Sequence, residues 1–427
     1  MNASFESNSP QPASLRHNRR FAALFLAEAV SGFGDRIHIF ALLLLVHART
    51  GRTFDLGLLA IIQVLPGTVL APLAGWVIDR VERRRLMMSL DLLQAVLVLL
   101  LPWTNSLGQI LTIAALLAVA RQFADPARMA VLPEVVNEDQ VLSANGALSS
   151  VLHLLLIVGP AAAGLIAGRY GLTACFRVDA ATYVLSALSL IGLGRCPHPE
   201  LEDALAGAGR AWKDFFAEIR QGLQVLTRDT ALRFTIVFFA LGTFISSMQQ
   251  PLVVVFVKDV LHGSDPQLGT LISMMGVGGI LGSVLAPASK RWVSAILVMP
   301  LATVLDGGAL IAFGLSSSIA PAMALFGAFG FVAGMLQVRV TSLFQARVPK
   351  QYRGRAFAWL GPLFGPLSVA SLALGTWIAD LTSVVKVIVA SGALEIAVAL
   401  AALLWLLGRP ALRSVSETGA TSAPPAP

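Results

Sequence analysis

Two carboxylic acids lie within an apolar run near the N-terminus. Glu28 and Asp35 are seven residues apart in the run from Phe21 to Val46. Seven residues are nearly two turns of an α-helix, so both side chains project from one face. A carboxyl group in a low-dielectric cavity can bind and release a proton near neutral pH. The pattern predicts proton coupling at Glu28 and Asp35, with a helix-packing hydrogen bond as the alternative for Asp35.

A second charged pair, Arg121 and Asp125, is spaced four residues apart in another apolar run. This spacing puts both side chains on one helix face, where they can form an ion pair. We expect Arg121 to pair with a carboxylate of the first run and to take part in proton coupling together with Asp125. Protonation of that carboxylate would release the arginine. A static ion pair between Arg121 and Asp125 is the alternative.

The composition indicates a membrane protein. Of 427 residues, 56% are hydrophobic and only 13% are charged, whereas an average soluble domain has about 25% charged residues. Apolar runs of about 20 residues are typical of spanning helices. The predicted spans are 21–46, 57–78, 86–103, 109–132, 147–169, 172–193, 233–257, 269–289, 294–315, 319–342, 356–379 and 384–407.

The sequence therefore predicts an all-α polytopic membrane protein with twelve transmembrane helices in two six-helix bundles. The expected units are an N-terminal tail (1–20), a first bundle (21–193), a central loop (194–232), a second bundle (233–407) and a disordered tail (408–427). The central loop includes Trp212–Thr227, whose apolar residues recur at helical spacing and predict an amphipathic helix at the membrane interface. Basic residues concentrate in alternate loops, which predicts that both termini are cytoplasmic.

The loop after the second span carries a motif of glycine, aspartate and arginines. It reads Gly75-Trp-Val-Ile-Asp79-Arg80-Val-Glu-Arg83-Arg84 and resembles motif A of the major facilitator superfamily. Gly75 would let helices approach closely. Asp79, near a helix end, would pair with arginines and backbone donors in a latch that gates one access state. A simple positive-inside anchor is the alternative.

The fifth span carries Gly159-Pro160-Ala-Ala-Ala-Gly164, which resembles motif C of the exporter branches of this superfamily. Pro160 removes a backbone hydrogen bond, and the glycines allow tight packing and bending. Leu155 and Ala163 stand where the family pattern has glycine. An ordinary kinked helix is the alternative.

Further stretches resemble the branch that includes the enterobactin exporter and macrolide efflux proteins. They are Phe123–Pro133, Ala144-Asn145, Gln345–Arg355, Gly34-Asp35 and Asp179-Ala180. The resemblance implies a monomeric alternating-access transporter driven by proton antiport. In this family, spans one, four, seven and ten line the substrate cavity. The candidate cavity residues on those spans are Arg36, Gln249, Gln250, Gln337 and Arg339.

These observations favour an exporter of small lipophilic compounds, either drugs such as macrolides or a siderophore, in the cell inner membrane. A lysophospholipid flippase or a metabolite importer of the same fold is the alternative, and an intramembrane sensor is least favoured. The chain lacks a zinc-protease motif and a Walker loop, so no enzyme activity, cofactor or metal is expected. The expected partners are a small-molecule substrate, protons and the lipid bilayer. The short basic clusters exclude a nucleic-acid face.

Overall fold

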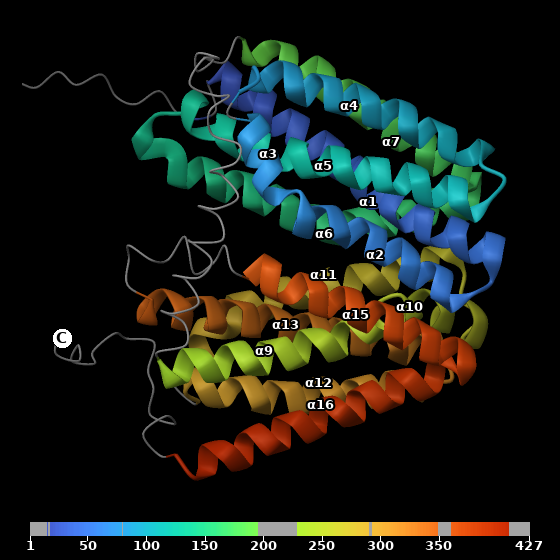
Figure 1. The fold of residues 1–427 in the computed structure, drawn as a ribbon, viewed down its shortest axis with the longest axis vertical. Helices are drawn as coiled ribbons and strands as arrows, with labels where there is room; N and C mark the ends of the chain where they lie inside the picture. Colours follow the sequence, from blue (N-terminus) through green and yellow to red (C-terminus); the bar gives the residue numbers. More distant parts are fainter. Residues whose placement is uncertain are drawn as a thin grey trace, which may run out of the picture.

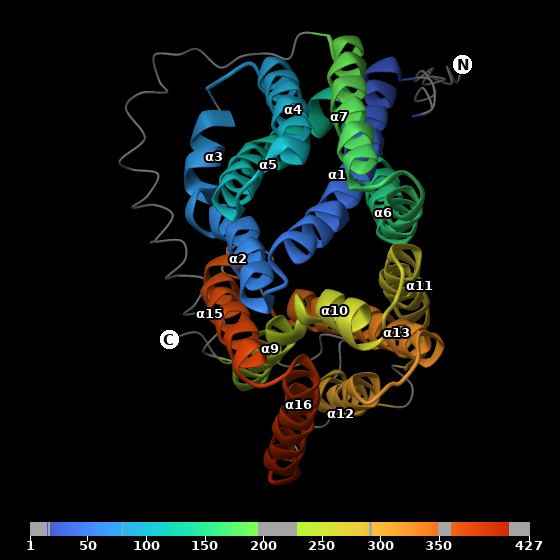
Figure 2. The same ribbon diagram turned by 90° about the vertical axis from the view of Figure 1, so that its right-hand side faces the viewer.

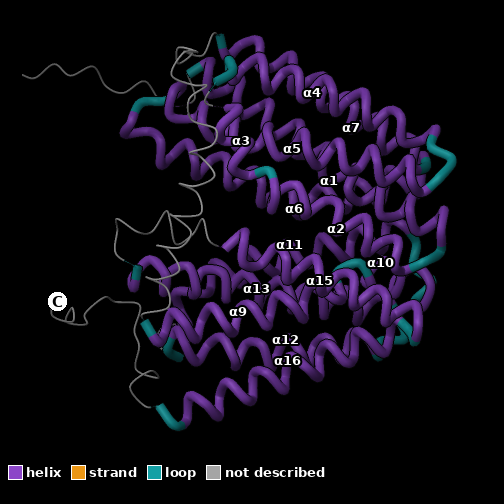
Figure 3. Tube along the Cα trace, in the orientation of Figure 1, coloured by secondary structure: helices purple, strands orange, loops and turns teal. Residues whose placement is uncertain are grey.

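The computed structural model describes residues 15, 18–78, 80–194, 229–289, 293–348 and 360–409. These ranges contain helices joined by short loops and no strand (Figure 3). Eleven helices in them are long and apolar enough to cross a membrane. The chain is thus an all-α, multi-pass membrane protein. The predicted amphipathic helix Trp212–Thr227 and the motif A residue Asp79 lie outside the described residues.

The N-terminal half forms one bundle, coloured blue to green in Figure 1. Its α-helices are α1 (Arg19–Thr50), α2 (Thr53–Val69), α3 (Ala71–Ile78), α4 (Arg83–Leu100), α5 (Leu107–Val135), α6 (Val141–Tyr170) and α7 (Leu172–Ser189). Short 3-10 segments, η2 (Leu101–Trp103), η3 (Glu138–Gln140) and η4 (Leu190–Leu193), extend or connect them. Apolar side chains from α1, α2, α4, α5, α6 and α7 fill the core between the helices.

The C-terminal half forms a second bundle, coloured yellow to red in Figure 1. It contains α9 (Thr230–Gln249), α10 (Leu252–Val255), the π-helix η6 (Phe256–Val260), α11 (Asp265–Ser289), α12 (Ala295–Gly314), α13 (Ile319–Arg347), α15 (Leu360–Leu381) and α16 (Val384–Leu407). Together α9, α10 and η6 make one span from Thr230 to Val260.

The second predicted span, 57–78, differs from the expectation because it is divided. The backbone breaks at Leu70 between α2 and α3, and the apolar part of α2 over Thr53–Gly67 is shorter than a full span. Pro66 lies inside α2, and Pro72 follows the break. Proline has no backbone N–H and clashes with the preceding turn, which interrupts a helix. The total of twelve spanning helices stays a prediction.

The two bundles meet through two helix pairs, α2 with α15 and α6 with α11 (Figure 2). In the first pair, the Asp380 carboxylate accepts hydrogen bonds from the backbone N–H groups of Thr53 at 2.9 Å and Phe54 at 3.0 Å. The first N–H groups of a helix have no partner within it, and Arg52 provides no side-chain cap. One bundle therefore caps a helix of the other.

The second pair depends on small residues. A Cβ atom at Gly164 would lie 2.5 Å from the Asp265 carbonyl oxygen, and one at Gly269 would lie 2.3 Å from the Pro160 carbonyl oxygen. The Ser273 hydroxyl donates to the Ile157 carbonyl oxygen at 2.5 Å. Without these small side chains, the backbones of α6 and α11 could not approach so closely.

The opposite end of the C-terminal bundle has a charged clamp. Asp229 accepts hydrogen bonds from the N–H groups of Ala231 and Leu232, and from Arg347 at 2.8 Å. Partial burial raises the pKa of Asp229, but the hydrogen bonds from Arg347 and the backbone outweigh this effect. The pKa of Asp229 therefore lies below its ordinary value.

We predict that Asp380→Ala loosens the contact between the bundles. Loss of a helix cap costs about 1 kcal/mol, which is about a five-fold change in an equilibrium. Cys175 is fully buried at this end of the molecule, with its thiol 3.7 Å from the Ala163 carbonyl oxygen. In a Cys196→Ser background, we expect maleimide to label Cys175 about five-fold faster in the Asp380→Ala variant.

The matched control is Asp259→Ala, which removes another carboxylate that bridges the bundles. Asp259 is 51% exposed and lies 3.0 Å from His47. Exposed ion pairs contribute little, so labelling should change less than in Asp380→Ala. Equal labelling rates in wild type and Asp380→Ala would contradict the proposed cap.

We predict that the Asp229 clamp stabilises the fold at neutral pH and fails in acid. A carboxyl group with a lowered pKa contributes stability above its ordinary pKa and loses it as the pH falls through the folded-state pKa. Asp229→Ala should cost about 1 kcal/mol at neutral pH, and the difference from wild type should shrink in acid. Thermal denaturation in detergent over a pH series measures this. Asp139→Ala, which removes an exposed acid from η3, is the control, and a pH-independent deficit for Asp229→Ala would contradict the prediction.

Candidate functional site

The N-terminal bundle holds a buried ion-pair network centred on Asp35 of α1. Its side chain is 7% exposed, and Oδ2 lies 3.3 Å from Nη2 of Arg121 on α5. The Tyr183 hydroxyl of α7 donates to Oδ1 of Asp35 at 2.5 Å. Arg121 also donates from Nε to Asp125, one turn along α5, at 3.3 Å. The expected partner on α1 and the alternative partner Asp125 thus both contact Arg121.

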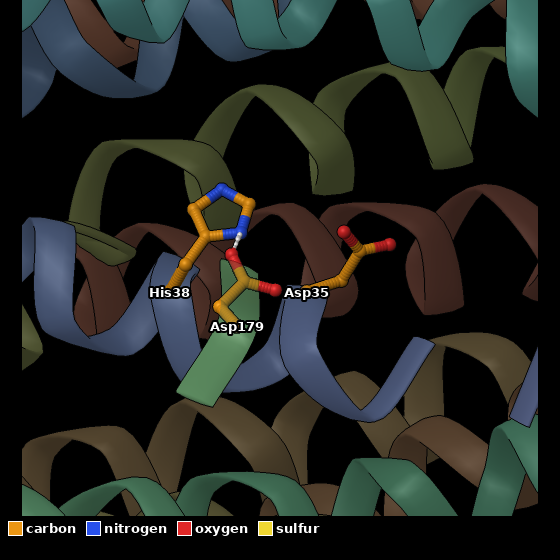
Figure 4. Close-up of side chains that lie close together, drawn as sticks. All are labelled: Asp35, His38 and Asp179. Carbon is orange, nitrogen blue, oxygen red and sulfur yellow. Dashed lines mark ion pairs between the residues drawn. The ribbon is translucent and has the colours of Figure 1, made fainter. Parts of the chain in front are cut away.

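One turn beyond Asp35, His38 forms an ion pair with Asp179 of α7 (Figure 4). Nδ1 of His38 lies 3.0 Å from Oδ2 of Asp179, and the two side chains are 8% and 0% exposed. A Cβ atom at Gly34 would lie 2.2 Å from Oδ1 of Asp179, so glycine is required for α7 to approach α1 here. Sequence reasoning missed His38 as a site residue, although a polar residue one turn from Asp35 in an apolar run was a usable signal.

A second network lies two turns away along α1. Glu28 is 3.3 Å from Nη1 of Arg128, and Nη2 of Arg128 donates to Asp91 of α4 at 2.9 Å. The Ser186 hydroxyl of α7 donates to the other Asp91 oxygen at 2.6 Å. Although Glu28 and Asp35 share a helix face, each is held by a different arginine. Sequence reasoning also missed Arg128 as a site residue, even though it lies seven residues after Arg121 and therefore on the same side of α5.

A cavity of about 290 Å³ opens beside the Asp35 network. It is lined by residues of α1, α2, α4, α5 and α7, and its polar lining consists of His38, Gln63, Gln94, Arg121, Gln122, Asp125 and Tyr183. The walls also include Leu42, Ala114 and Leu117. A pocket with apolar walls and a few convergent polar groups is suited to binding a small molecule.

The five residues predicted for a substrate cavity do not line this cavity, and their role in binding substrate stays a prediction. Arg36 packs against α6, where a Cβ atom at Gly159 would lie 2.4 Å from the Arg36 Cβ. Arg339 is 1% exposed and donates to the Ser289 hydroxyl and the Val293 carbonyl, so it ties α13 to the end of α11. Gln249, Gln250 and Gln337 do not line this cavity either. Spans one and four of the family pattern do line this cavity, as α1 and α5, whereas its lining includes no residue of the C-terminal bundle.

The described motif A residues act locally. Arg83, in the first turn of α4, forms an ion pair with Glu134 near the end of α5. Arg80 lies in the turn before α4 and Arg84 in its first turn. A Cβ atom at Gly75 would meet no atom within 4 Å, so the expectation that this glycine permits close helix packing is wrong in this conformation.

The motif C residues Gly159, Pro160 and Gly164 place α6 between two neighbours. Gly159 faces α1, whereas the backbone at Pro160 and Gly164 faces α11 of the other bundle. Pro160 lies inside α6 and removes one backbone hydrogen bond from the helix. This motif therefore lies at the contact between the bundles rather than in the cavity.

The buried cluster is rich in carboxylates. Four acids form ion pairs with Arg121 or Arg128, namely Glu28, Asp35, Asp91 and the half-exposed Asp125, and a fifth acid, Asp179, pairs with His38. Buried charge is stable only when it is paired or neutralised. The arrangement is therefore suited to binding and releasing protons. Donor atoms of Asp35, His38 and Asp179 lie within 4.8 Å of one another, but Tyr183 and Arg121 already engage both Asp35 oxygens, so the three residues do not offer three open metal ligands.

The comparisons agree with the fold. The model of the Major Facilitator Superfamily matches residues 24–372. A solved POT family transporter in complex with 5-aminolevulinic acid has a TM-score of 0.73 at 11% identity, over 94% of this chain and 98% of that chain. The protein belongs to the major facilitator superfamily. Members of this family are transporters, not enzymes.

Three curated relatives cover most of the chain. Macrolide efflux protein A of Streptococcus pyogenes is 23% identical over 89% of this chain and 94% of its own. Multidrug efflux pump Tap of Mycolicibacterium fortuitum is 26% identical over 81% of this chain and 86% of its own. Lysophospholipid transporter LplT of Serratia proteamaculans is 27% identical over 77% of this chain and 81% of its own.

We predict that Arg128 is the more important arginine for stability. Its side chain is 8% exposed between two acids, whereas the Arg121 side chain is 35% exposed at the cavity. Removing one partner of a buried pair costs on the order of 3–5 kcal/mol because the other charge is left unpaired. Arg128→Leu should lower the thermal denaturation midpoint in detergent much more than Arg121→Leu. Equal losses would contradict this ranking.

Proposed function

We propose that this protein is a secondary active exporter of small lipophilic compounds, driven by proton antiport. The single observation that carries this proposal is the Asp35–Arg121 pair beside the cavity. It joins α1 to α5, and it contains a group that can take up a proton. A site that binds substrate next to a site that binds protons is what an antiporter requires.

The coupling step is competition for Asp35. When Asp35 is ionised, it holds Arg121, and Arg121 in turn holds Asp125. A proton on Asp35 cancels that attraction and frees the guanidinium group to rearrange in the cavity. A ligand shifts a conformational equilibrium only if it binds the two states unequally. The proton meets this condition because only one state keeps the ion pair.

The access change would separate the helix pairs that join the bundles. We propose that both termini are cytoplasmic, which would put the Asp380 cap at the external face and make this conformation the one closed to the outside. Opening that face needs the loss of the cap on α2 and of the contacts between α6 and α11. We place the protein in the cell inner membrane as a monomer whose two bundles move against each other.

The substrate class follows from the cavity and the relatives. Leu42, Ala114 and Leu117 give the cavity apolar walls, which favour a lipophilic compound. Two of the relatives reported above are named for macrolide and multidrug efflux. None of the three is named for a siderophore, so siderophore export has no support from them.

A second candidate is translocation of lysophospholipids. It is favoured by the 27% identity to the lysophospholipid transporter LplT. A lysophospholipid has one acyl chain and a charged headgroup, and the cavity offers apolar walls together with the charged side chains of Arg121 and Asp125. The two candidates are distinguished by the compound that moves protons.

We predict that Asp35→Asn abolishes substrate-linked proton movement. Asparagine keeps the size of the side chain but cannot ionise, so the proton and Arg121 no longer compete. Everted membrane vesicles containing a pH-sensitive dye should release protons when erythromycin is added, and Asp35→Asn should lower this signal at least about ten-fold, the loss that removing a proton-transfer group typically exceeds. Glu28→Gln tests whether the second acid of α1 contributes.

The matched control is Glu138→Gln, which neutralises an exposed acid in η3 outside both networks. This variant should match wild type. Proton release by lysophosphatidylethanolamine but not by erythromycin would favour the second candidate. Full proton release in Asp35→Asn would contradict the proposed coupling site.

A further inference from the structure

The His38–Asp179 pair is not used by the coupling step described above. It shares α1 and α7 with the Asp35–Tyr183 contact, but its own ion pair at 3.0 Å is separate. Asp179 is fully buried, and besides its contact with His38 its side chain has a hydrogen bond from the Thr182 hydroxyl at 3.4 Å. A fully buried carboxylate needs a compensating positive charge. His38 is the ionisable group placed to supply that charge.

The His38 ring also faces the cavity. It forms part of the cavity lining together with Arg121, Asp125 and Tyr183, whereas Asp179 does not. One ring nitrogen, Nδ1, faces Asp179. When Nδ1 carries its hydrogen toward the carboxylate, the other ring nitrogen has a free lone pair that can accept a proton from cavity water. The ring is therefore the link between the cavity and the buried acid.

One additional proton would balance the charged groups around His38. Next to His38 on α1 is Asp35; α7 contributes Asp179 and Tyr183, and α5 contributes Arg121 and Asp125. From α4, Asp91 is already bound by Arg128 and Ser186, and the neutral Gln94 lines the cavity. Arg121 already balances Asp35. Asp179 therefore lacks a counter-charge until the His38 imidazole gains a proton.

A metal ion fits this position less well. A divalent ion would need Asp35 as a third ligand, and Tyr183 and Arg121 engage both oxygens of Asp35. Figure 4 shows His38 and Asp179 facing each other, with the Asp35 carboxylate turned away. The guanidinium group of Arg121 lies 3.3 Å from Asp35 and would also repel a dication bound to that carboxylate. A proton needs only the contact that is already formed.

We propose that His38 and Asp179 form a second proton-binding site, in which the imidazole takes a proton from the cavity and the buried carboxylate balances its charge. This inference deepens the proposed antiport, because the transporter would then exchange protons at two sites, Asp35 and His38. For a substrate with one positive charge, exchange against two protons moves net charge, so transport would depend on membrane potential as well as on the pH gradient. Cavity water supplies one proton to a ring nitrogen, and the same proton leaves to water when access changes.

The test is a pH titration of the purified full-length protein with ¹⁵N-labelled histidine, followed by NMR in detergent. The His38 signal is identified by its absence in His38→Gln. We expect it to convert between the neutral and the cationic ring. In Asp179→Asn, the cationic form should require at least about ten-fold higher proton concentration, because an opposite charge within a few ångströms is lost. A His38 signal that never titrates, or that titrates identically in Asp179→Asn, overturns the proposal.

Further measurements test whether the titration belongs to the His38–Asp179 pair. The signals of His153 and His262 report whether each variant is folded. If Asp179→Asn does not fold, Thr182→Val replaces it, because this variant removes the hydroxyl that donates to the Asp179 carboxylate but keeps the carboxylate charge. Glu138→Gln removes an exposed acid of η3 outside both networks and should leave the titration unchanged. If stoichiometric Mn²⁺ displaces the proton from His38, the site binds metal and the proton proposal is wrong.

The transport assay separates this inference from the proposed antiport. If erythromycin releases protons in wild-type vesicles, His38→Gln should release about half as many per erythromycin moved, because one of two sites is lost. An unchanged ratio overturns the second site and leaves the antiport intact. If no compound releases protons, the antiport fails, and the NMR titration still decides whether His38 and Asp179 bind a proton.

Discussion

The cost of placing charge in a low-dielectric interior governs the N-terminal bundle. Every acid in its buried cluster meets a guanidinium group, an imidazole or a hydroxyl group. Arg128 and Arg121 of α5 supply the positive charge, and they bind acids of α1 and α4. These ion pairs position the helices relative to one another. The cavity lies beside the Arg121–Asp35 pair, which is more exposed than the Arg128 pairs. The more exposed ion pair is therefore the one that water and substrate can reach.

The contact between the bundles follows a different rule. Helices in lipid gain little from burying apolar surface against each other, so close packing and hydrogen bonds decide whether they associate. Glycines at α6 and α11 bring backbones together, and Asp380 caps α2 across the contact. These interactions are individually weak and lie at one end of the molecule. They can break together while each bundle stays intact, as a rigid-body movement requires.

The two bundles differ in how their buried residues are used. In the C-terminal bundle, α11 and α13 pack through facing glycines, where a Cβ atom at Gly282 would lie 1.9 Å from the Phe331 carbonyl oxygen. Its buried Arg339 is used to hold helix ends. The described cavity and the ion-pair networks lie in the N-terminal bundle. In this conformation the C-terminal bundle acts as a closely packed partner against which the other bundle is held.

The sequence by itself determined the membrane class, the helix positions and the family, because apolar run length and the spacing of the glycine, aspartate and arginine motifs are local properties. It also indicated Asp35, Arg121 and Asp125 as candidate site residues, because an ionisable residue within an apolar run can be recognised before its partner is known. Tertiary structure decided which acid met which arginine: Glu28 binds Arg128 and not Arg121. It likewise revealed His38 with Asp179 and excluded Arg339 from the cavity. Such pairings depend on how helices distant in sequence rotate and approach, and this is set by packing contacts such as Gly34 against α7 that no local pattern encodes.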